Sequence, residues 1–451
     1  MDLSVQEQNE IYSQVLDERL PVMEISNCNV YRRFQFEDIK CRRIVFHSVV
    51  FKELFLLNTI QASDVKMEFY NCQFEKDVKF IKSTLKNLIF DQCEGPFILL
   101  QELQLKDIFL NRSSIKSISL IDLTLESFSV GFLRNSILSF SRLQCDNLIL
   151  NKNASDFYVD IDVYDDISRI KNLYIVFIST FTGNVSINYT FIDTVIIEGK
   201  LDRGIINLTN NTFKKIKISK FINSGTATLS NPKLYSDSTI SIDESDLGKA
   251  YLFDVNFNLF QSVTIHSSNL QDIIYSGVKW CSFNDSVPMT FAQRRESYKQ
   301  LKNVCARQND KPEELKFYGL EMNSYMHQLK EEKGRWNDKL ILKFNWLTNN
   351  HGQTWVQPLL IIIGLIITIY FPVKILLGFT SFQPEKSITA ISEMLECLNP
   401  IRKFSDSFGQ NGLTKDNVNT GIAKILDILF LRLIIGLLLF QMVKAFRKYV
   451  R

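Results

Sequence analysis

Residues 33–57 read RFQFEDIKCRRIVFHSVVFKELFLL, and an apolar pair with one residue between its members recurs there every five positions. The pairs are Phe34/Phe36, Ile39/Cys41, Ile44/Phe46, Val49/Phe51 and Leu54/Leu56. Side chains repeat about every 2 residues in a strand and about every 3.6 residues in an α-helix, so neither element explains a five-residue step. The spacing predicts a chain that turns a corner every five residues and points each apolar pair inward.

A longer period accompanies the short one. The pairs that begin successive coils are Met23/Ile25, Ile44/Phe46, Val65/Met67, Leu88/Phe90, Ile108/Leu110, Phe128/Val130, Leu148/Leu150, Leu173/Ile175, Val195/Ile197, Ile216/Ile218, Ile240/Ile242 and Val263/Ile265. Between residues 103 and 150 the five-residue step has only two exceptions, Ser113 and Asn135. Four steps make one coil, and parallel pairing stacks coils about 4.8 Å apart, which predicts a solenoid on the order of 55 Å long. A β-sandwich is the alternative, although sandwiches hold no five-residue phase.

The five-residue step in residues 34–56 and 103–150 resembles that of pentapeptide-repeat proteins. The resemblance implies a right-handed, four-sided β-helix. That family prefers a small residue at the first inward position, whereas this chain has Phe34, Ile39, Ile44 and Leu54 there. We therefore expect a wider or less regular solenoid, above all in residues 151–250, where one coil takes 25 residues.

Composition narrows the possible functions. The 451 residues are 45% hydrophobic and 22% charged with a net charge of +3, which is ordinary for a globular protein and argues against a generally basic nucleic-acid binder. The eight cysteines contain no Cys-x-x-Cys pair and indicate a reducing, cytosolic compartment. No basic flank followed by an apolar run begins the chain, so no secretory signal is expected. With 35 phenylalanines against 17 glycines and 9 prolines, the turns must be made by other residues.

The chain divides into segments of different character. We expect an N-terminal helical cap in residues 1–22, the cytoplasmic solenoid in 23–288 and a helical hairpin in 289–335, in which Asp310, Pro312 and Glu313 have capping-box spacing. The hairpin either caps the solenoid or packs against copies of itself. Residues 336–354 form a short amphipathic helix of the kind that lies in a membrane interface.

Two apolar segments follow. Residues 355–377 and 422–451 each contain a run long enough to cross about 30 Å of hydrocarbon, which predicts two transmembrane helices and a basic tail. Basic residues before the first span and after the second place both termini in the cytoplasm. Residues 378–421 then form an extracytoplasmic loop, in which residues 387–398 are a possible re-entrant helix.

Several stretches of residues 250–451, among them RRESYKQLK, FYGLEM, LTNNHGQTWVQPL and RLIIGLLLFQMVKAFRKYV, are similar to bacterial pentapeptide-repeat membrane proteins whose last region looks like a two-helix channel. The layout also resembles the transmembrane effector of the Hailong anti-phage system. The resemblance implies a homo-oligomeric inner-membrane pore, with a tetramer favoured, that acts in anti-phage defence and is gated by a nucleotide or oligonucleotide. The alternative is a membrane-anchored scaffold for a protein partner without a pore.

An enzyme finds little support in the sequence. The four histidines have no i, i+4 spacing, and neither a glycine-rich phosphate loop nor Gly-x-Ser-x-Gly is present. The acidic run DVYDD at 162–166, after Asp160, fits a solvated loop better than a pair of catalytic acids. We expect no catalytic residues, no metal and no cofactor. The potassium filter Thr-Val-Gly-Tyr-Gly is also missing, so potassium selectivity by backbone carbonyls is not expected.

The candidate functional residues form two groups. In the second span, Arg432 is a charge in an apolar run that either forms a ring in an oligomer or pairs with Asp427 near the interface. Gly364 and Gly436 are close-packing points or hinges. On the solenoid, basic clusters either hold an anionic ligand or are solvated turns; they are Arg32/Arg33, Arg42/Arg43 and Lys214/Lys215/Lys217/Lys220. Arg32 and Arg42 are ten residues apart, which predicts opposite sides of a four-sided coil.

Overall fold

The computed structural model describes residues 7, 21–36, 39–131, 133, 136–152, 157–162, 168–181, 183–282, 289–331, 335–377, 387–408 and 418–446. The chain forms two compact units, Met1–Met289 and Thr290–Arg451. Most of the expected N-terminal cap, residues 163–166 of the acidic run, Asn135 and the basic tail after residue 446 lie outside the described residues.

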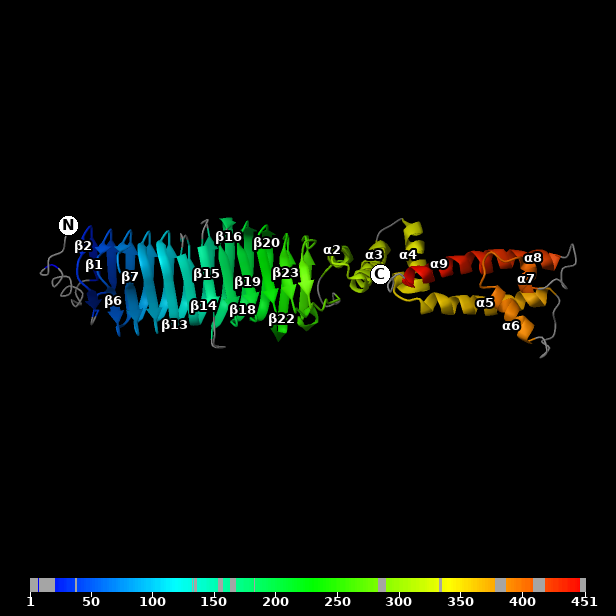
Figure 1. Ribbon diagram of the computed structural model, residues 1–451, viewed down its shortest axis with the longest axis horizontal. Coiled ribbons are helices and arrows are strands. Elements are labelled where there is room, and N and C mark those ends of the chain that lie inside the picture. Colours follow the sequence, from blue (N-terminus) through cyan, green and yellow to red (C-terminus); the bar gives the residue numbers. More distant parts are fainter. Residues whose placement is uncertain are drawn as a thin grey trace. The chain divides into compact units, whose positions relative to one another are not determined.

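The first unit is a stack of parallel strands (Figure 1). The strands are β1 (Val22–Ser26), β2 (Asn29–Val30), β3 (Phe34–Phe36), β4 (Arg43–His47), β5 (Val50–Phe51), β6 (Phe55–Asn58), β7 (Gln61–Tyr70), β8 (Gln73–Phe74), β9 (Val78–Ile81), β10 (Thr84–Asp91), β11 (Glu94–Gln101), β12 (Gln104–Asn111), β13 (Ser114–Val130), β14 (Ser136–Lys152), β15 (Phe157–Asp162), β16 (Arg169–Phe181), β17 (Asn184–Asn188), β18 (Phe191–Leu201), β19 (Ile205–Thr209), β20 (Thr212–Asn223), β21 (Thr226–Ser230), β22 (Lys233–Asp243), β23 (Ala250–Phe253), β24 (Ser262–His266) and β25 (Ile274–Ser276), with the short 3₁₀-helix η1 (Phe257–Leu259) after β23. The prediction of a parallel β-solenoid is confirmed, with about eleven turns.

The strand register confirms the coil spacing almost throughout. Met23 pairs with Ile44, and from Leu88 onward the predicted pairs follow one another in register through Ile108, Phe128 and Leu148 to Val263. The third coil is the exception, because Ile44 pairs with Met67 and not with Val65. The predicted pair Val65/Met67 was therefore wrong by two residues, and Met67/Phe69 begins that coil.

A second correction falls inside the opening stretch. Phe55 and Leu57 are fully buried and continue the rows of Phe34 and Phe36, whereas Leu54 is half-buried. The predicted pair Leu54/Leu56 was therefore wrong by one residue. The physical reason is a wider corner, since one additional residue separates buried Phe51 from buried Phe55.

The phenylalanines fill the first coils by stacking on equivalent residues of the next coil. Phe46, Phe69 and Phe90 form a ladder with ring centroids 4.9 Å apart at each step and rings within 7° of parallel. Phe51 stacks on Phe74 in the same way at 5.0 Å. A phenylalanine ring fills more of the interior than the small residue that pentapeptide-repeat proteins prefer at the first inward position. Aromatic pairs also add attraction beyond their buried area.

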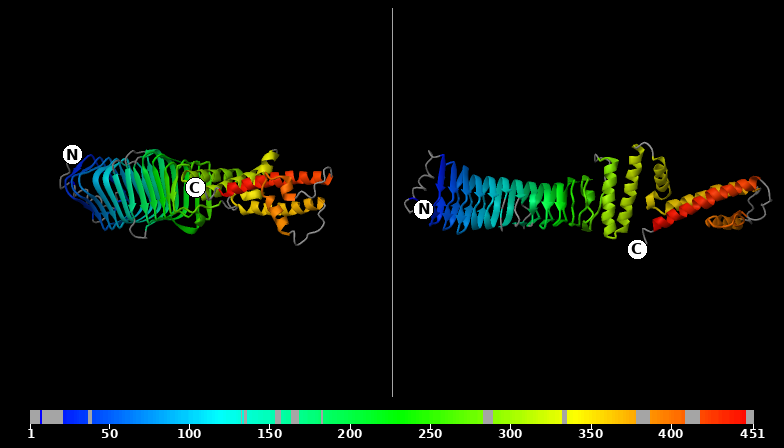
Figure 2. Two further views of the ribbon diagram at one scale, coloured as in Figure 1. Left: turned by 45° about the vertical axis from the view of Figure 1, so that its right-hand side comes forward. Right: turned by 90° about the horizontal axis from the view of Figure 1, so that it is seen from above.

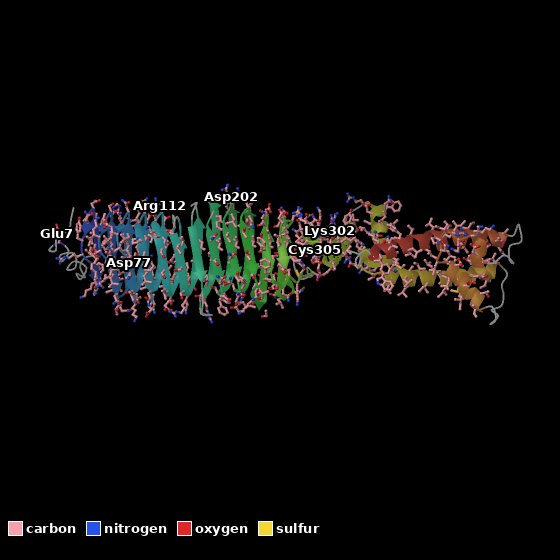
Figure 3. The ribbon with its side chains drawn as sticks, viewed as in Figure 1. Glu7, Asp77, Arg112, Asp202, Lys302 and Cys305 are labelled. Atoms are coloured by element: carbon pink, nitrogen blue, oxygen red, sulfur yellow. The ribbon has the colours of Figure 1, made fainter. Side chains whose placement is uncertain are left out.

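The corners explain the shortage of glycine and proline. Residues with a side chain adopt the left-handed conformation at successive corners, among them Asn27, Ser48, Asn71, Gln92 and Arg112, whose φ angles lie between 46° and 57°. Each of the first four donates its N–H to a carbonyl of the next coil at 2.9–3.0 Å. The bond to the neighbouring coil offsets the cost of the conformation. Figure 3 labels Arg112 at the edge of the stack.

A ladder of polar side chains also runs inside the solenoid, which the sequence did not predict. Ser83, Ser113, Ser168, Thr190 and Asn211 are all buried. Ser168 Oγ accepts a hydrogen bond from Leu143 N at 2.8 Å, and Asn211 Oδ1 accepts one from Thr190 N at 2.9 Å. These side chains satisfy backbone groups at the corners, where the strand ladder is interrupted.

The second unit is helical (Figure 2). Its elements are α2 (Phe291–Arg307), α3 (Lys311–Glu331), α4 (Trp336–Asn349), the short η2 (Asn350–Gly352), α5 (Val356–Leu376), α6 (Ser387–Glu396), α7 (Phe404–Phe408), α8 (Val418–Leu426), the π-helical η4 (Asp427–Ile434) and α9 (Ile435–Phe446).

Helices α2 and α3 form the predicted hairpin. Thr290 caps α2 in a capping box with Gln293, and Asp310 Oδ1 accepts a bond from Glu313 N at 3.4 Å at the start of α3. Figure 3 labels Lys302 on α2, whose ammonium lies 2.7 Å from the buried carboxylate of Glu321 on α3.

Among the described residues, one helix is long and apolar enough to cross a membrane, namely α5. The second predicted span falls on α8, η4 and α9, which follow one another without a break from Val418 to Phe446. The π-helical segment η4 divides this run into shorter pieces. The described part of the chain therefore has one candidate span by this criterion, and the second remains a prediction.

Candidate functional site

The most unusual group of charges in the helical unit surrounds Asp427, the first residue of η4. Its side chain has no exposed surface and contacts two guanidinium groups. Arg402 contacts Oδ1 through Nη2, and Arg432 Nε lies 2.7 Å from Oδ2. Two positive charges and one negative charge therefore lie together among apolar side chains. We call Arg402, Asp427 and Arg432 the charge triad.

The π-helical winding of η4 brings the last two members together. Arg432 is five residues after Asp427, and in an α-helix such residues point about 140° apart. A π-helix bonds residue i to residue i+5 and turns less per residue, so the two side chains lie on nearly the same side. The sequence predicted this pairing as one of two alternatives for Arg432, and the structure has it. The side chain of Arg432 keeps 27% of its surface exposed.

Arg402 was missed by the sequence analysis. It lies in the turn between α6 and α7, where Ile401 N donates to Asn399 Oδ1 at 3.0 Å. Its side chain is 1% exposed, and it contacts Ser407 Oγ through Nε and the carbonyl of Asn399 through Nη1 at 3.2 Å. Since Arg402 is 25 residues from Asp427 and sits in no periodic pattern, no spacing in the sequence indicated the contact.

A second polar network joins the same segment to α5. Tyr370 Oη donates to Glu393 Oε2 on α6 at 2.9 Å, and Lys374 forms an ion pair with the same carboxylate. Tyr370 itself is buried and stacks on Phe408 of α7 with ring centroids 5.8 Å apart. The predicted re-entrant segment thus contains α6 and is tied to α5 by Glu393, while the charge triad ties the following turn to η4.

Hydrogen bonds between side-chain amides join α4 to α9 near the start of α5. Asn349 Nδ2 donates to Gln441 Oε1 on α9 at 2.5 Å, and Gln441 Nε2 donates to Asn345 Oδ1 on α4 at 3.0 Å. Gln353 contacts the carbonyl of Leu315 on α3. These bonds join the hairpin, α4 and α9 around η2.

His351 lies buried in this junction, and its Nε2 has no hydrogen-bond partner among the residues that the structure describes. Burial lowers the pKa of His351 below its usual range, and the nearby charge of Lys444 lowers it further. The imidazole is therefore neutral at neutral pH.

The two candidate glycines do not pack closely within the chain. A Cβ at Gly364 would meet nothing within 4 Å, and one at Gly436 would lie 3.9 Å from Pro400 Cβ. Neither glycine is therefore needed for a close approach among the described residues. A role as a hinge or in packing between chains stays a prediction.

The four arginines of the two arginine clusters differ in their contacts. Arg43 is held by Glu68, with Nη2–Oε2 at 2.6 Å and Nε–Oε1 at 3.1 Å, and Tyr70 Oη donates to the same carboxylate at 3.0 Å. The Glu68 contact raises the pKa of Arg43. Arg32, Arg33 and Arg42 are exposed.

These arginines do not form one site. Arg32 and Arg33 lie between β2 and β3, whereas Arg42 and Arg43 lie at the start of β4, which stacks on β1. The expected separation of Arg32 from Arg42 fits this arrangement. In the lysine cluster, Lys214 forms an ion pair with Asp237 at 2.9 Å, Lys215 and Lys220 are exposed, and Lys217 is half-buried.

The two groups of candidates thus differ in kind. The basic residues of the solenoid are spread over separate sides and partly neutralised, whereas Arg432 and Asp427 belong to one buried constellation that also includes Arg402. A buried charge cluster between apolar helices is a stronger indication of function than exposed arginines on a solvated surface. Comparisons of the chain with models of protein families, with curated proteins and with solved structures found no match.

Proposed function

We propose that this chain is the subunit of a homo-oligomeric membrane pore, with α5 and the run α8–η4–α9 as its two spans and the solenoid as the cytoplasmic sensor that gates it. In this proposal the solenoid is a right-handed, four-sided β-helix related to the pentapeptide-repeat fold. Both termini lie in the cytoplasm of a bacterial cell, because Lys339, Lys343 and Lys444 flank the spans on that side. A role in anti-phage defence and a tetrameric state belong to the proposal as well.

The observation that carries the proposal is the reversed polarity of the two long helices. Large apolar side chains face outward, among them Leu360 at 62%, Phe440 at 62% and Leu433 at 57% exposure, while Asp427 and Arg402 are buried. A helix pair that exposes apolar residues and buries charges is suited to hydrocarbon and unsuited to water.

Helix α4 supports the same environment. Trp336, Ile341 and Leu347 are 68%, 59% and 54% exposed, whereas Leu342 and Asn349 are buried against the rest of the unit. An amphipathic helix with its tryptophan-bearing apolar face turned outward fits the plane of a membrane interface.

The charge triad supplies a group that a pore requires. Arg432 is partly exposed, and the triad carries one net positive charge because Asp427 neutralises only one of two guanidinium groups. Several copies around an axis would present a ring of Arg432 side chains, and rings of basic side chains favour anions.

Conductance in planar bilayers tests the proposal. The full chain is reconstituted as wild type, as Arg432→Ala and as Lys343→Ala, a matched control on the exposed face of α4. We expect channel events for wild type and for Lys343→Ala, and an altered conductance or ion preference for Arg432→Ala. Unchanged currents in Arg432→Ala would remove Arg432 from the pathway, and no conductance by wild type with or without an added oligonucleotide would refute the pore.

The second candidate function is a membrane-anchored scaffold. It is favoured by the finding that α5 alone satisfies the criteria for a span among the described residues. Replacing residues 356–446 with an unrelated membrane anchor distinguishes the two, because a scaffold keeps its cellular activity after the exchange and a pore loses it.

A further inference from the structure

One face of the solenoid carries a groove of about 980 Å³ that runs along the stack of coils. Its floor is a row of residues that pair with one another from coil to coil, in the order Thr84, Gln104, Thr124, Gln144 and Arg169. Phe191 continues the row, and the guanidinium of Arg169 lies 5.8 Å from the centre of its ring. The row spans five steps from Thr84 to Phe191, or about 24 Å.

Insertions close the groove at both ends. At one end the register moves from Ala62–Leu85 to Lys66–Asn87, and the added residues include Ser63, which lines the groove. At the other end it moves from Phe213–Leu234 to Lys215–Thr239, and the added residues include Tyr235, which also lines it. The groove therefore has a defined length.

The wall of the groove carries a pattern of charge. Each floor residue is followed two positions later by a charged residue, and these are Lys86, Lys106, Glu126, Asp146, Lys171 and Asp193 in the order of the coils. All of them are exposed except Lys86, which is half-buried. Arg169 adds a second positive charge beside Lys171. The strip is therefore positive over the two coils of Lys86 and Lys106, negative over the two coils of Glu126 and Asp146, and positive again on the single coil of Arg169 and Lys171, with Asp193 at the end. Lys106 Nζ lies 3.5 Å from Glu126 Oε2 where the first two blocks meet, so these two charges partly offset each other in the free chain.

This order of charges selects among possible polymers. A nucleic acid or another polyanion would lie against Glu126 and Asp146 in the middle of the groove, where like charges repel. A polycation would meet the same repulsion at both lysine blocks. A polypeptide can carry either sign at each position, and it advances about 3.4 Å per residue when extended. Three residues therefore span about 10 Å, which matches one block of two coils.

We propose that this groove binds an extended segment of a partner protein in which a central basic block is flanked by two acidic blocks. The flanking acidic residues contact Lys86/Lys106 on one side and Lys171/Arg169 on the other, and the basic block contacts Glu126/Asp146. The Thr and Gln side chains of the floor donate and accept hydrogen bonds with the backbone of that segment. The inference concerns the solenoid alone and does not depend on the pore.

Two fluorescent peptides of identical composition test the proposal. The matched peptide has the order acidic, basic, acidic, with two, four and two charged residues. The reversed peptide has the order basic, acidic, basic with the same counts, so both have zero net charge. Binding to the full chain is measured by fluorescence anisotropy at low salt and at 0.5 M salt. We expect the matched peptide to bind at least tenfold more tightly, and the difference to shrink at high salt.

Charge reversal in the groove supplies the matched variants. The double variant Glu126→Lys/Asp146→Lys should lose the preference for the matched peptide, whereas Glu24→Lys/Glu94→Lys, two exposed acids outside the groove, should keep it. A second variant, Lys86→Glu/Lys106→Glu, should also weaken the binding of the matched peptide. It keeps the proposal testable if the first variant fails to fold. Equal binding of the two peptides, or tighter binding of a twelve-residue oligothymidylate than of the matched peptide, would overturn the proposal.

Discussion

The carboxylate of Asp427 has no contact with solvent and forms ion pairs with two guanidinium groups. Desolvating a carboxylate costs several kcal/mol, and ion pairs of good geometry return that free energy. Removing the carboxylate would leave Arg402 and Arg432 close together without a counter-ion, and Arg402 is itself 1% exposed. The ion pair of Asp427 with Arg402 thus connects the turn after α6 to η4.

We predict that Asp427→Asn destabilises the packing of residues 399–408 against residues 418–434 by about 3–5 kcal/mol. Hydrogen exchange followed by mass spectrometry in membrane-mimetic discs should show faster exchange in residues 399–408 and 418–434. The control is Glu396→Gln, which removes an exposed carboxylate at the end of α6 and should leave exchange unchanged. Equal protection in Asp427→Asn and wild type would contradict a stabilising triad.

His351 gives a pH dependence with a definite sign. Its pKa in the folded chain is lowered, first by burial and second by Lys444, whereas the unfolded chain has the usual value of about 6.5. The unfolded state therefore binds the proton more readily. The contribution to stability is fully present above about pH 6.5 and is lost as the pH falls from there toward the lower pKa of the folded state.

We predict that the thermal unfolding of the helical unit shifts to lower temperature between pH 7.5 and pH 5.5, with a loss of at most about 1.4 kcal/mol per pH unit from this residue. His351→Gln should reduce that shift, whereas His266→Gln on β24 should not. Tryptophan fluorescence is a suitable measurement, since Trp336, Trp346 and Trp355 all belong to this unit. An identical pH dependence in wild type and His351→Gln would exclude His351 as the cause.

At the scale of the element, the coil corner combines an unfavourable backbone conformation with a favourable hydrogen bond to the next coil. Thr59 has a φ of 61°, although β-branched residues avoid the left-handed region. Its N–H donates to Ile81 O of the next coil at 3.0 Å, so the fold imposes the conformation. A residue that tolerates this region should relieve the strain without loss of the bond.

We predict that Thr59→Asn stabilises the solenoid by about 1 kcal/mol, because Asn adopts the left-handed conformation more readily than Thr. The matched control is Thr228→Asn in the middle of β21, which should lower the stability because Asn is disfavoured in strands. The urea midpoint of the β-sheet circular dichroism signal measures both. A decrease for Thr59→Asn comparable to that for Thr228→Asn would show that the corner carries no such strain.

The corners also mark what the sequence could predict. The inward pairs were recovered from apolar spacing because burial selects large apolar residues at fixed steps. The phase was lost at Leu54 and Val65, where the chain takes additional residues without changing its composition. A corner formed by Thr, Lys or Arg cannot be recognised from the sequence, because it contains no glycine or proline. In the helical unit, Asp427 and Arg432 were found because a charge in an apolar run is conspicuous, whereas Arg402 was missed because a charge in a polar loop is not.

At the scale of the whole molecule, the proposed function assigns each segment to one side of a membrane. All eight cysteines are buried, so an impermeant maleimide should react little with the native chain. Single cysteines at exposed positions then report sidedness. Suitable sites are Lys116→Cys on β13, Asn337→Cys on α4, Lys403→Cys in the turn before α7 and Phe446→Cys at the end of α9.

We predict that only Lys403→Cys is labelled in intact cells and that all four variants are labelled after lysis. In the proposed topology, two spans place residue 403 outside and return residue 446 to the cytoplasmic side, on which the proposal also places the solenoid and α4. Labelling of both Lys403→Cys and Phe446→Cys in intact cells would mean that α5 alone crosses, since the run α8–η4–α9 would then stay outside. Labelling of none would mean that neither helix crosses, and the outward apolar faces of α5 and α9 would then have to be covered by protein instead of lipid.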